Sequence, residues 1–96
     1  MAARKQDKIV KDSGVAATLT IAINDTHKTQ LQIAEEVGFE STNMVTMIKQ
    51  GRSKLPIAKV RIIADCLEID AKDLLIQCME EYQPQEWAVI REILKV

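Results

Sequence analysis

One central stretch of the sequence decides which fold we predict: residues 29–51 read TQLQIAEEVGFESTNMVTMIKQG. Its first half begins at Thr29, a natural N-cap, and stops at Gly38. Between them, apolar positions recur at helical spacing at Leu31, Ile33, Ala34 and Val37. Its second half begins after Ser41, another good N-cap, and is stopped by Gly51. The stretch therefore predicts two short helices, over 29–37 and 42–50, joined by a tight turn.

The residues at the turn are those that two closely crossing helices require. Ala34 is small, so a second helix can cross against it, and Gly38 can take a left-handed backbone conformation at low cost. Apolar residues on the second helix then fix the crossing angle, and its opposite face stays clear of the protein body. The pattern is that of a helix-turn-helix.

Apolar periodicity and capping residues predict further helices on both sides of this stretch. Before it, a helix is expected over 14–24, capped by Asp12 or Ser13, with Val15, Leu19, Ala22 and Ile23 on its apolar face. The alternation over 19–23 also fits a strand, but the sequence offers no second strand to pair with it.

After the central stretch, three more helices are expected. Pro56 opens one over 57–67, Asp70 caps one over 71–82, and Pro84 starts a last one that runs to Val96. The residues expected to face inward are Val60, Ile63, Ala64 and Leu67, then Leu74, Leu75, Cys78 and Met79. The fold class is all-α, a compact domain of five or six helices.

The central stretch resembles the helix-turn-helix of the Cro and lambda-repressor family, and the resemblance covers roughly residues 14–75. The matching positions are Thr29, Gln30, Ile33, Ala34, Gly38 and Phe39, then Val45, Ile48, Lys49, Gln50 and Gly51, with Pro56, Ala64 and Leu67 beyond. The resemblance implies sequence-specific binding to double-stranded DNA by a small transcriptional regulator, expected to be a repressor of the kind that bacteriophages and bacteria use. It also implies a homodimer on a palindromic site, with the helix over 42–50 in the major groove.

Two registers are possible for this recognition helix, and they differ in which pair of apolar residues faces the core. The usual family spacing, counted from Gln30, would bury Met44 and Met47, but the final glycine falls one place late, at Gly51. One extra residue in the turn would instead bury Val45 and Ile48, with the methionines flanking the seam. We favour the second register because Ser41 and Gly51 then lie at the two ends of the helix.

In that register, one row of polar side chains faces the DNA. Base contacts are expected from Thr42, Asn43, Thr46 and Gln50, with Asn43 first because a side-chain amide can pair bidentately with adenine. Phosphate contacts are expected from Lys49, Arg52 and Lys54 and, by resemblance to the family glutamine, from Gln30. For the threonines and Gln30, an ordinary solvated helix surface is the alternative.

The chain divides into a basic tail over 1–11, the helix-turn-helix domain over 12–82 and a last helix over 83–96. The last helix is the expected dimer interface, because Trp87, Ile90, Ile93 and Leu94 lie along one face. The alternative is that this helix folds back onto the core of its own chain.

Charge is segregated along the 96 residues, although the net charge is only −1. Residues 41–61 carry five basic side chains and no acid, whereas residues 62–96 carry eight acids against three bases. The basic segment supports phosphate binding. The acidic last third supports a second hypothesis, in which the fold serves as a protein-interaction module such as an anti-repressor or an antitoxin-like partner.

Other classes of function fit the sequence poorly. It holds one histidine, no nucleophile motif and no phosphate loop, so we expect neither an enzyme nor a cofactor. Cys66 and Cys78 lack metal-ligand spacing, and we expect them to be free buried thiols, with a disulfide as the open alternative. The expected setting is cytoplasmic, with no secretory signal, no membrane span, no metal and no small-molecule ligand.

Overall fold

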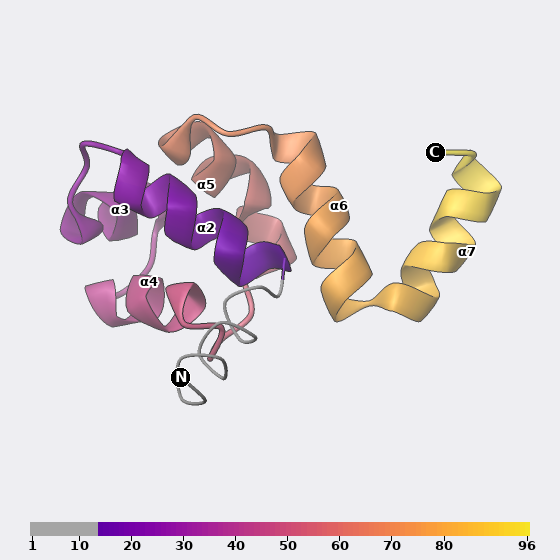
Figure 1. The fold of residues 1–96 in the computed structure, drawn as a ribbon, viewed down its shortest axis with the longest axis horizontal. Coiled ribbons are helices and arrows are strands. Elements are labelled where there is room, and N and C mark those ends of the chain that lie inside the picture. Colours follow the sequence, from indigo (N-terminus) through magenta and orange to yellow (C-terminus); the bar gives the residue numbers. More distant parts are fainter. Residues whose placement is uncertain (1–13) are drawn as a thin grey trace, which may run out of the picture.

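The computed structural model describes residues 14–96 and shows an all-α domain in that part of the chain (Figure 1). Its elements are α2 (Gly14–Asp25), α3 (Gln30–Val37), α4 (Thr42–Lys49), the short 3₁₀ helix η1 (Ile57–Lys59), α5 (Val60–Leu67), α6 (Ala71–Tyr82) and α7 (Pro84–Leu94). The predicted fold class, an all-α domain of five or six helices, is confirmed. The basic tail over 1–11 and the caps proposed at Asp12 and Ser13 lie outside the described residues.

The core forms where α2 to α6 meet. Helix α2 packs against α4 and α6, α3 packs against α4 and α5, and α5 packs against α6. Each of these helices contributes at least one side chain that is almost fully buried, and the connection after α4 adds Leu55. These side chains are Leu19, Ile33, Ile48, Leu55, Ile63 and Leu74. Both cysteines are free and buried, as the sequence predicts.

Two residues predicted to face inward do not. Leu31 on α3 is 57% exposed and Leu75 on α6 is 39% exposed. On α3 the residues that face the core are Ile33, Ala34 and Val37. On α6 the core position beside Leu75 is occupied by Leu74. Because adjacent positions on a helix are turned about 100° apart, Leu74 and Leu75 cannot both face the same core.

The helix boundaries also differ from the prediction at several ends. The segment after Pro56 begins as the 3₁₀ helix η1 and becomes α-helical only at Val60, so Ile57 stays partly exposed. Helix α4 ends at Lys49, one residue before the predicted Gln50. Helix α7 ends at Leu94, because Lys95 takes a left-handed conformation.

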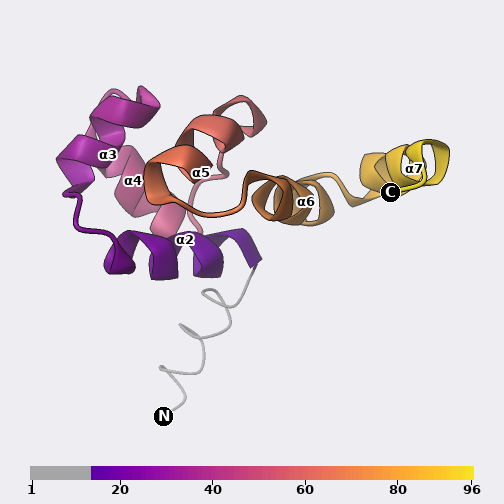
Figure 2. The ribbon, with the colours of Figure 1, turned by 90° about the horizontal axis from the view of Figure 1, so that it is seen from above.

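Helix α7 stands apart from the rest of the molecule. It follows α6 after a single residue, Gln83, and the two helices form an open V (Figures 1 and 2). Gln83 leaves helical geometry, with φ −141° and ψ 61°, as expected for a residue before a proline, where α conformations are disfavoured. No residue of α7 is fully buried. The alternative in which this helix folds back onto the core of α2 to α5 is therefore not the arrangement seen.

Candidate nucleic-acid interface

Helix α3 is held at its start by a complete capping box. The Thr29 hydroxyl accepts a hydrogen bond from the backbone N–H of Gln32 at 3.1 Å, and the Gln32 side chain accepts one from the N–H of Thr29 at 2.8 Å. Two backbone donors that the helix itself cannot satisfy are thereby paired. The start of α3 is fixed, and with it the position of Gln30, the first residue of the helix.

The turn between α3 and α4 follows the predicted chemistry. Gly38 has φ 89°, in the left-handed region, and its N–H and that of Phe39 both donate to the carbonyl of Ala34, at 2.9 and 2.8 Å. Ala34 is 2% exposed and lies in the core. Phe39 packs partly against that core. The chain thus reverses within a few residues and delivers α4 across α3.

The register of α4 is the one that the sequence favours. Val45 and Ile48 are each 2% exposed and belong to the core, whereas Met44 and Met47 are only half-buried. The two methionines line an open groove of about 400 Å³, together with the turn residues 38–41, Asn43, Pro56 and Lys59. Ser41 occupies the N-cap position with extended backbone, but its side chain makes no capping hydrogen bond, contrary to the role predicted for it.

The side of α4 that faces away from Val45 and Ile48 is a row of polar residues. Thr42, Asn43 and Gln50 are exposed, and Thr46 and Lys49 are half-buried. At about 100° per residue, these five positions span an arc of roughly 120° around the helix axis. The four residues predicted to contact bases therefore share one face, which is continuous and accessible.

A hydrogen bond links this face to α3. The Thr46 hydroxyl donates to the side-chain carbonyl of Gln30 at 3.0 Å. The contact occupies the oxygen of the Gln30 amide, and the amide nitrogen is the end able to donate to a phosphate. Gln30 thus braces α4 in the structure. Asn43 has a weaker local contact, from its amide nitrogen to the sulfur of Met47 at 3.5 Å.

The far end of α4 is tied to α2. The hydroxyl of Thr20 donates to the backbone carbonyl of Lys49 at 3.0 Å. This bond satisfies one of the carbonyls that a helix leaves unpaired at its C-terminus. Just beyond, the Arg52 guanidinium donates to the side chain of Gln50 at 3.2 Å. Lys49, Gln50 and Arg52 therefore follow one another along the end of the polar row.

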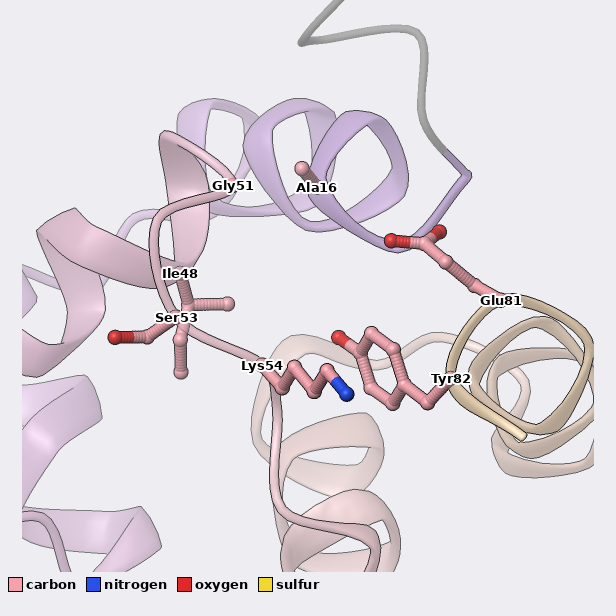
Figure 3. A pocket seen from close by; sticks show the side chains of 7 residues that line it. All are labelled: Ala16, Ile48, Gly51, Ser53, Lys54, Glu81 and Tyr82. Atoms are coloured by element: carbon pink, nitrogen blue, oxygen red, sulfur yellow. The ribbon is translucent and has the colours of Figure 1, made fainter.

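Lys54 points elsewhere. Its ammonium lies 5.5 Å from the centre of the Tyr82 ring, and Figure 3 shows the side chain directed toward that ring. The Tyr82 hydroxyl accepts a hydrogen bond from the backbone N–H of Leu55 at 2.9 Å, which fixes the ring against the same loop. Burial raises the pKa of the Tyr82 hydroxyl. Of the residues predicted to contact phosphates, Lys54 is the one that the structure separates from the α4 row.

Lys59 is a basic residue near the site whose role the sequence left open, together with that of Arg61, because successive helical positions cannot all face one way. A Cβ placed on Gly38 would lie 3.0 Å from its ammonium, so Lys59 reaches the turn between α3 and α4. It also borders the groove beside Asn43. Sequence periodicity places Lys59 at the start of a helix but cannot show which turn that helix passes. Its neighbour in the basic segment, Arg61, instead forms a salt bridge with Asp65 at 3.3 Å.

A second charged cluster is structural. The Lys28 ammonium lies 2.8 Å from a carboxylate oxygen of Glu36 and donates at 2.8 Å to the backbone carbonyl of Cys66. It joins the α2–α3 connection to α3 and α5. The hydrogen bond raises the pKa of Lys28 and lowers that of Glu36. Burial raises the pKa of the Cys66 thiol and raises that of Cys78 to about 11, so both thiols stay protonated near neutral pH.

Comparisons of the chain with protein-family models, with curated proteins and with solved structures found no match. Within residues 14–96 no helix is both long enough and apolar enough to cross a membrane. The same residues contain no group of three or more side chains suited to hold a metal ion. The functional argument therefore rests on the α3–α4 geometry and on the residues it presents.

Proposed function

We propose that this protein is a helix-turn-helix DNA-binding protein that reads double-stranded DNA with α4. One observation carries the proposal: α4 is anchored by Val45 and Ile48, while its polar row stands clear of the core. A helix with side chains is about 10 to 12 Å across, which matches the width of the major groove of B-DNA. Within this class, we propose a small transcriptional regulator of the Cro and lambda-repressor type, acting as a repressor.

Each residue of the row has a proposed role. Asn43 reads a base, because its amide can pair bidentately with adenine and its side chain is exposed. Thr42 and Gln50 contact base edges on either side of it. Thr46 contacts a base edge and also keeps its hydrogen bond to Gln30. The amide nitrogen of Gln30 donates to a phosphate.

Basic residues next to the row supply the phosphate contacts. Lys49 and Arg52 follow the end of α4, and Lys59 reaches the turn at its start. Lys54 is the weakest member of this set, because its ammonium already lies over the Tyr82 ring. Residues 41–61, which include α4, carry only basic charges, whereas the acids of the last third begin beyond them. Positive surface gathers along the segment that would meet the duplex.

The test is selection from a random duplex library at moderate salt, followed by affinity measurements on the selected site. A palindromic motif with half-sites about one helical turn apart is expected for a dimeric regulator. Asn43→Ala should cost about 1–3 kcal/mol in binding for each half-site and relax the preference at one base pair of each half-site. Asn24→Ala is the matched control, since Asn24 is an exposed helical asparagine on α2. Equal effects of the two substitutions would contradict the assignment of α4.

Phosphate contacts have a separate signature in the salt dependence. If a dimer neutralises about eight phosphates, log K falls with log salt at a slope of roughly −7. Arg52→Ala removes one phosphate contact from each protomer, so it should make that slope shallower by about 2 and weaken all sequences alike. Lys72→Ala, at an exposed lysine on α6, should leave the slope unchanged. A change of base preference in Arg52→Ala would reassign that residue to a base.

One observation favours the second candidate, a protein-interaction module. The groove beside α4 is lined by Phe39, Met44 and Met47, and methionine-lined surfaces suit protein partners. Absence of any enriched DNA sequence, even at low salt, would favour this role over the first. In that case a partner would be lost on Met47→Lys and retained on Gln50→Ala, since Gln50 does not line the groove.

A further inference from the structure

Helix α7 exposes aliphatic side chains that a helix normally covers. Val89, Ile93 and Leu94 are 53%, 70% and 63% exposed, and Val96 just beyond the helix is 66% exposed. At about 100° per residue, Val89, Ile93 and Leu94 together with Trp87 and Ile90 occupy an arc of roughly 160°, and Glu86 lies within it. The remaining side carries Gln85, Ala88, Arg91 and Glu92, and Lys95 and Val96 follow the end of the helix. The helix is therefore amphipathic, and most of its apolar side is exposed.

Helix α6 accounts for only one edge of that arc. It is the helix in contact with α7, and within the arc Trp87 and Ile90 alone are half-buried. The two views in Figures 1 and 2 agree that α7 reaches away from α2 to α5. Trp87 and Ile90, expected from the sequence to form a dimer interface with Ile93 and Leu94, instead belong partly to the contact with α6. The uncovered face of the helix consists of Val89, Ile93 and Leu94, with Glu86 among them.

The polar groups in this part of the molecule are also incompletely paired. Among the described residues, the buried side-chain nitrogen and oxygen atoms without a hydrogen-bond partner are Oε1 of Gln77 on α6 and Nε1 of Trp87 on α7. One accepts and the other donates. Buried polar atoms without partners are uncommon in a completed structure. They occur here on the two helices that form the open V, and not in the bundle of α2 to α5.

The charges of α7 indicate what kind of surface would cover it. Glu86 lies in its first turn, Arg91 lies in its last turn, and Lys95 follows the helix. With Glu92, the segment 84–96 carries two acids and two bases and is neutral. Two copies of α7 placed antiparallel would set Glu86 of one level with Lys95 of the other, whereas Arg91 and Glu92 lie on the side away from the uncovered face. Parallel copies would set like charges side by side.

We propose that the uncovered face of α7 binds the same face of a second copy, with the two α7 helices antiparallel about a two-fold axis. A two-fold interface uses one patch twice, so the uncovered apolar face of α7 can meet the same face of a second copy, with Glu86 of each helix level with Lys95 of the other. The acidic character of the last third resides before α7, on α5 and α6, so the pairing helices do not repel each other. The inference deepens the proposed function, because a palindromic site requires two copies, but its test does not involve DNA.

The size of α7 sets the strength to expect. Eleven residues make a helix about 16 Å long, so pairing along α7 gives an interface near the small end of the specific range, below about 1,200 Å² in total. Such interfaces are typically weak, so a dissociation constant on the order of micromolar is expected. The protein should therefore exchange between monomer and dimer at accessible concentrations.

Sedimentation equilibrium of the full chain over about 1 μM to 1 mM measures this exchange. The expected result is a shift from the chain mass of 10.8 kDa to twice that value. Ile93→Glu should raise the dissociation constant at least about 100-fold, because it places a carboxylate in the apolar seam. Ile21→Glu on α2 is the matched control, since Ile21 is also an isoleucine exposed to 70%. Circular dichroism of both variants checks that the helices are retained.

Spin labels distinguish the antiparallel arrangement from a parallel one. Single cysteines at Gln85, Ala88 and Lys95 are exposed and can be labelled, whereas Cys66 and Cys78 are buried. For antiparallel helices centred near Ile90, positions 85 and 95 lie about 15 Å from their copies along the axis, and position 88 only about 6 Å. In a parallel pair, positions 85, 88 and 95 would all have the same axial distance to their copies. That result would overturn the antiparallel orientation.

Two further outcomes would overturn the dimer itself. One is a single 10.8 kDa species up to about 1 mM. The other is a dimer that Ile21→Glu dissociates and Ile93→Glu does not. Failure of the DNA-binding proposal looks different: a dimer sensitive to Ile93→Glu would persist, with no selected DNA sequence.

Discussion

Helices α4 and α7 use their apolar residues in opposite ways. Helix α4 has eight residues and buries Val45 and Ile48, whereas α7 has eleven residues and buries none. Helix α4 lies against both α2 and α3, so its apolar side is covered and a polar row remains. Among the described elements, the main neighbour of α7 is α6, and an apolar face remains exposed. The chemistry that each helix leaves uncovered is the basis for the partners proposed above, nucleic acid for α4 and a second copy of the chain for α7.

The largest expected effect tests this contrast directly. Ile48→Ala should lower the free energy of unfolding by about 2–5 kcal/mol, because it removes a buried side chain and leaves a cavity. Ile93→Ala should change it by no more than about 0.5 kcal/mol when the chain is monomeric, because Ile93 already faces water. Urea denaturation at low protein concentration measures both values. Equal losses would mean that α7 packs on the core in solution.

The next effect concerns the turn that positions α4. Gly38→Ala should cost about 1–2 kcal/mol, because a Cβ is disfavoured in the left-handed conformation that Gly38 adopts. The ammonium of Lys59, 3.0 Å from the new methyl group, must also move. Gly14→Ala is the control, since its Cβ would meet only Glu81 at an ordinary 3.4 Å. If Gly14→Ala lowered the free energy of unfolding as much as Gly38→Ala, the left-handed conformation assigned to Gly38 would be contradicted.

A smaller effect compares the starts of α3 and α4. Thr29→Ala should lower the free energy of unfolding by about 1 kcal/mol, because the capping box loses its hydroxyl acceptor. Ser41→Ala should cost only a few tenths, since the Ser41 hydroxyl makes no capping bond that could be lost. Thermal unfolding of the two variants gives the comparison. A cost at Ser41 equal to that at Thr29 would show that Ser41 caps α4 in solution.

The smallest effect is a dependence on pH. The hydrogen bond from Lys28 lowers the pKa of Glu36 below its ordinary 4.5, so the ionised carboxylate favours the folded state. Its contribution is complete above about pH 4.5 and is lost as the pH falls through the lower pKa of the folded state. In Glu36→Gln, the free energy of unfolding, measured by urea denaturation at a series of pH values, should fall less steeply on the acid limb, that is, as the pH drops below about 4.5. Glu35→Gln, at an exposed glutamate on the same helix, should leave that limb unchanged.

The helices of this fold could be predicted from local signals, because each has a cap, a glycine or a proline at or near an end. The capping box at Thr29, the left-handed Gly38 and the Asp70 cap of α6 are found where the sequence places them. Burial was harder to assign. Leu31 and Leu75 carry apolar side chains on the exposed sides of their helices, and nothing in the residue type indicates this.

Contacts that depend on the path of a loop could not be predicted at all. Leu55, in the connection after α4, is almost fully buried although it belongs to no helix. Lys54 and Lys59 are equally basic in the sequence, yet one ammonium lies over the Tyr82 ring and the other beside Gly38. The polar row of α4 could be predicted because helical geometry alone fixes it, once the register is chosen.

Tyr82 connects the bend between α6 and α7 to the loop that follows α4. It is the last residue of α6, one place before the bend at Gln83, and its hydroxyl is bonded to Leu55 in the loop that follows α4. This bond therefore links the end of α6 to the loop after α4. In the proposed dimer it would be one of the contacts that set the distance between the two α4 helices, and hence the spacing of half-sites that the proposed DNA-binding pair would span.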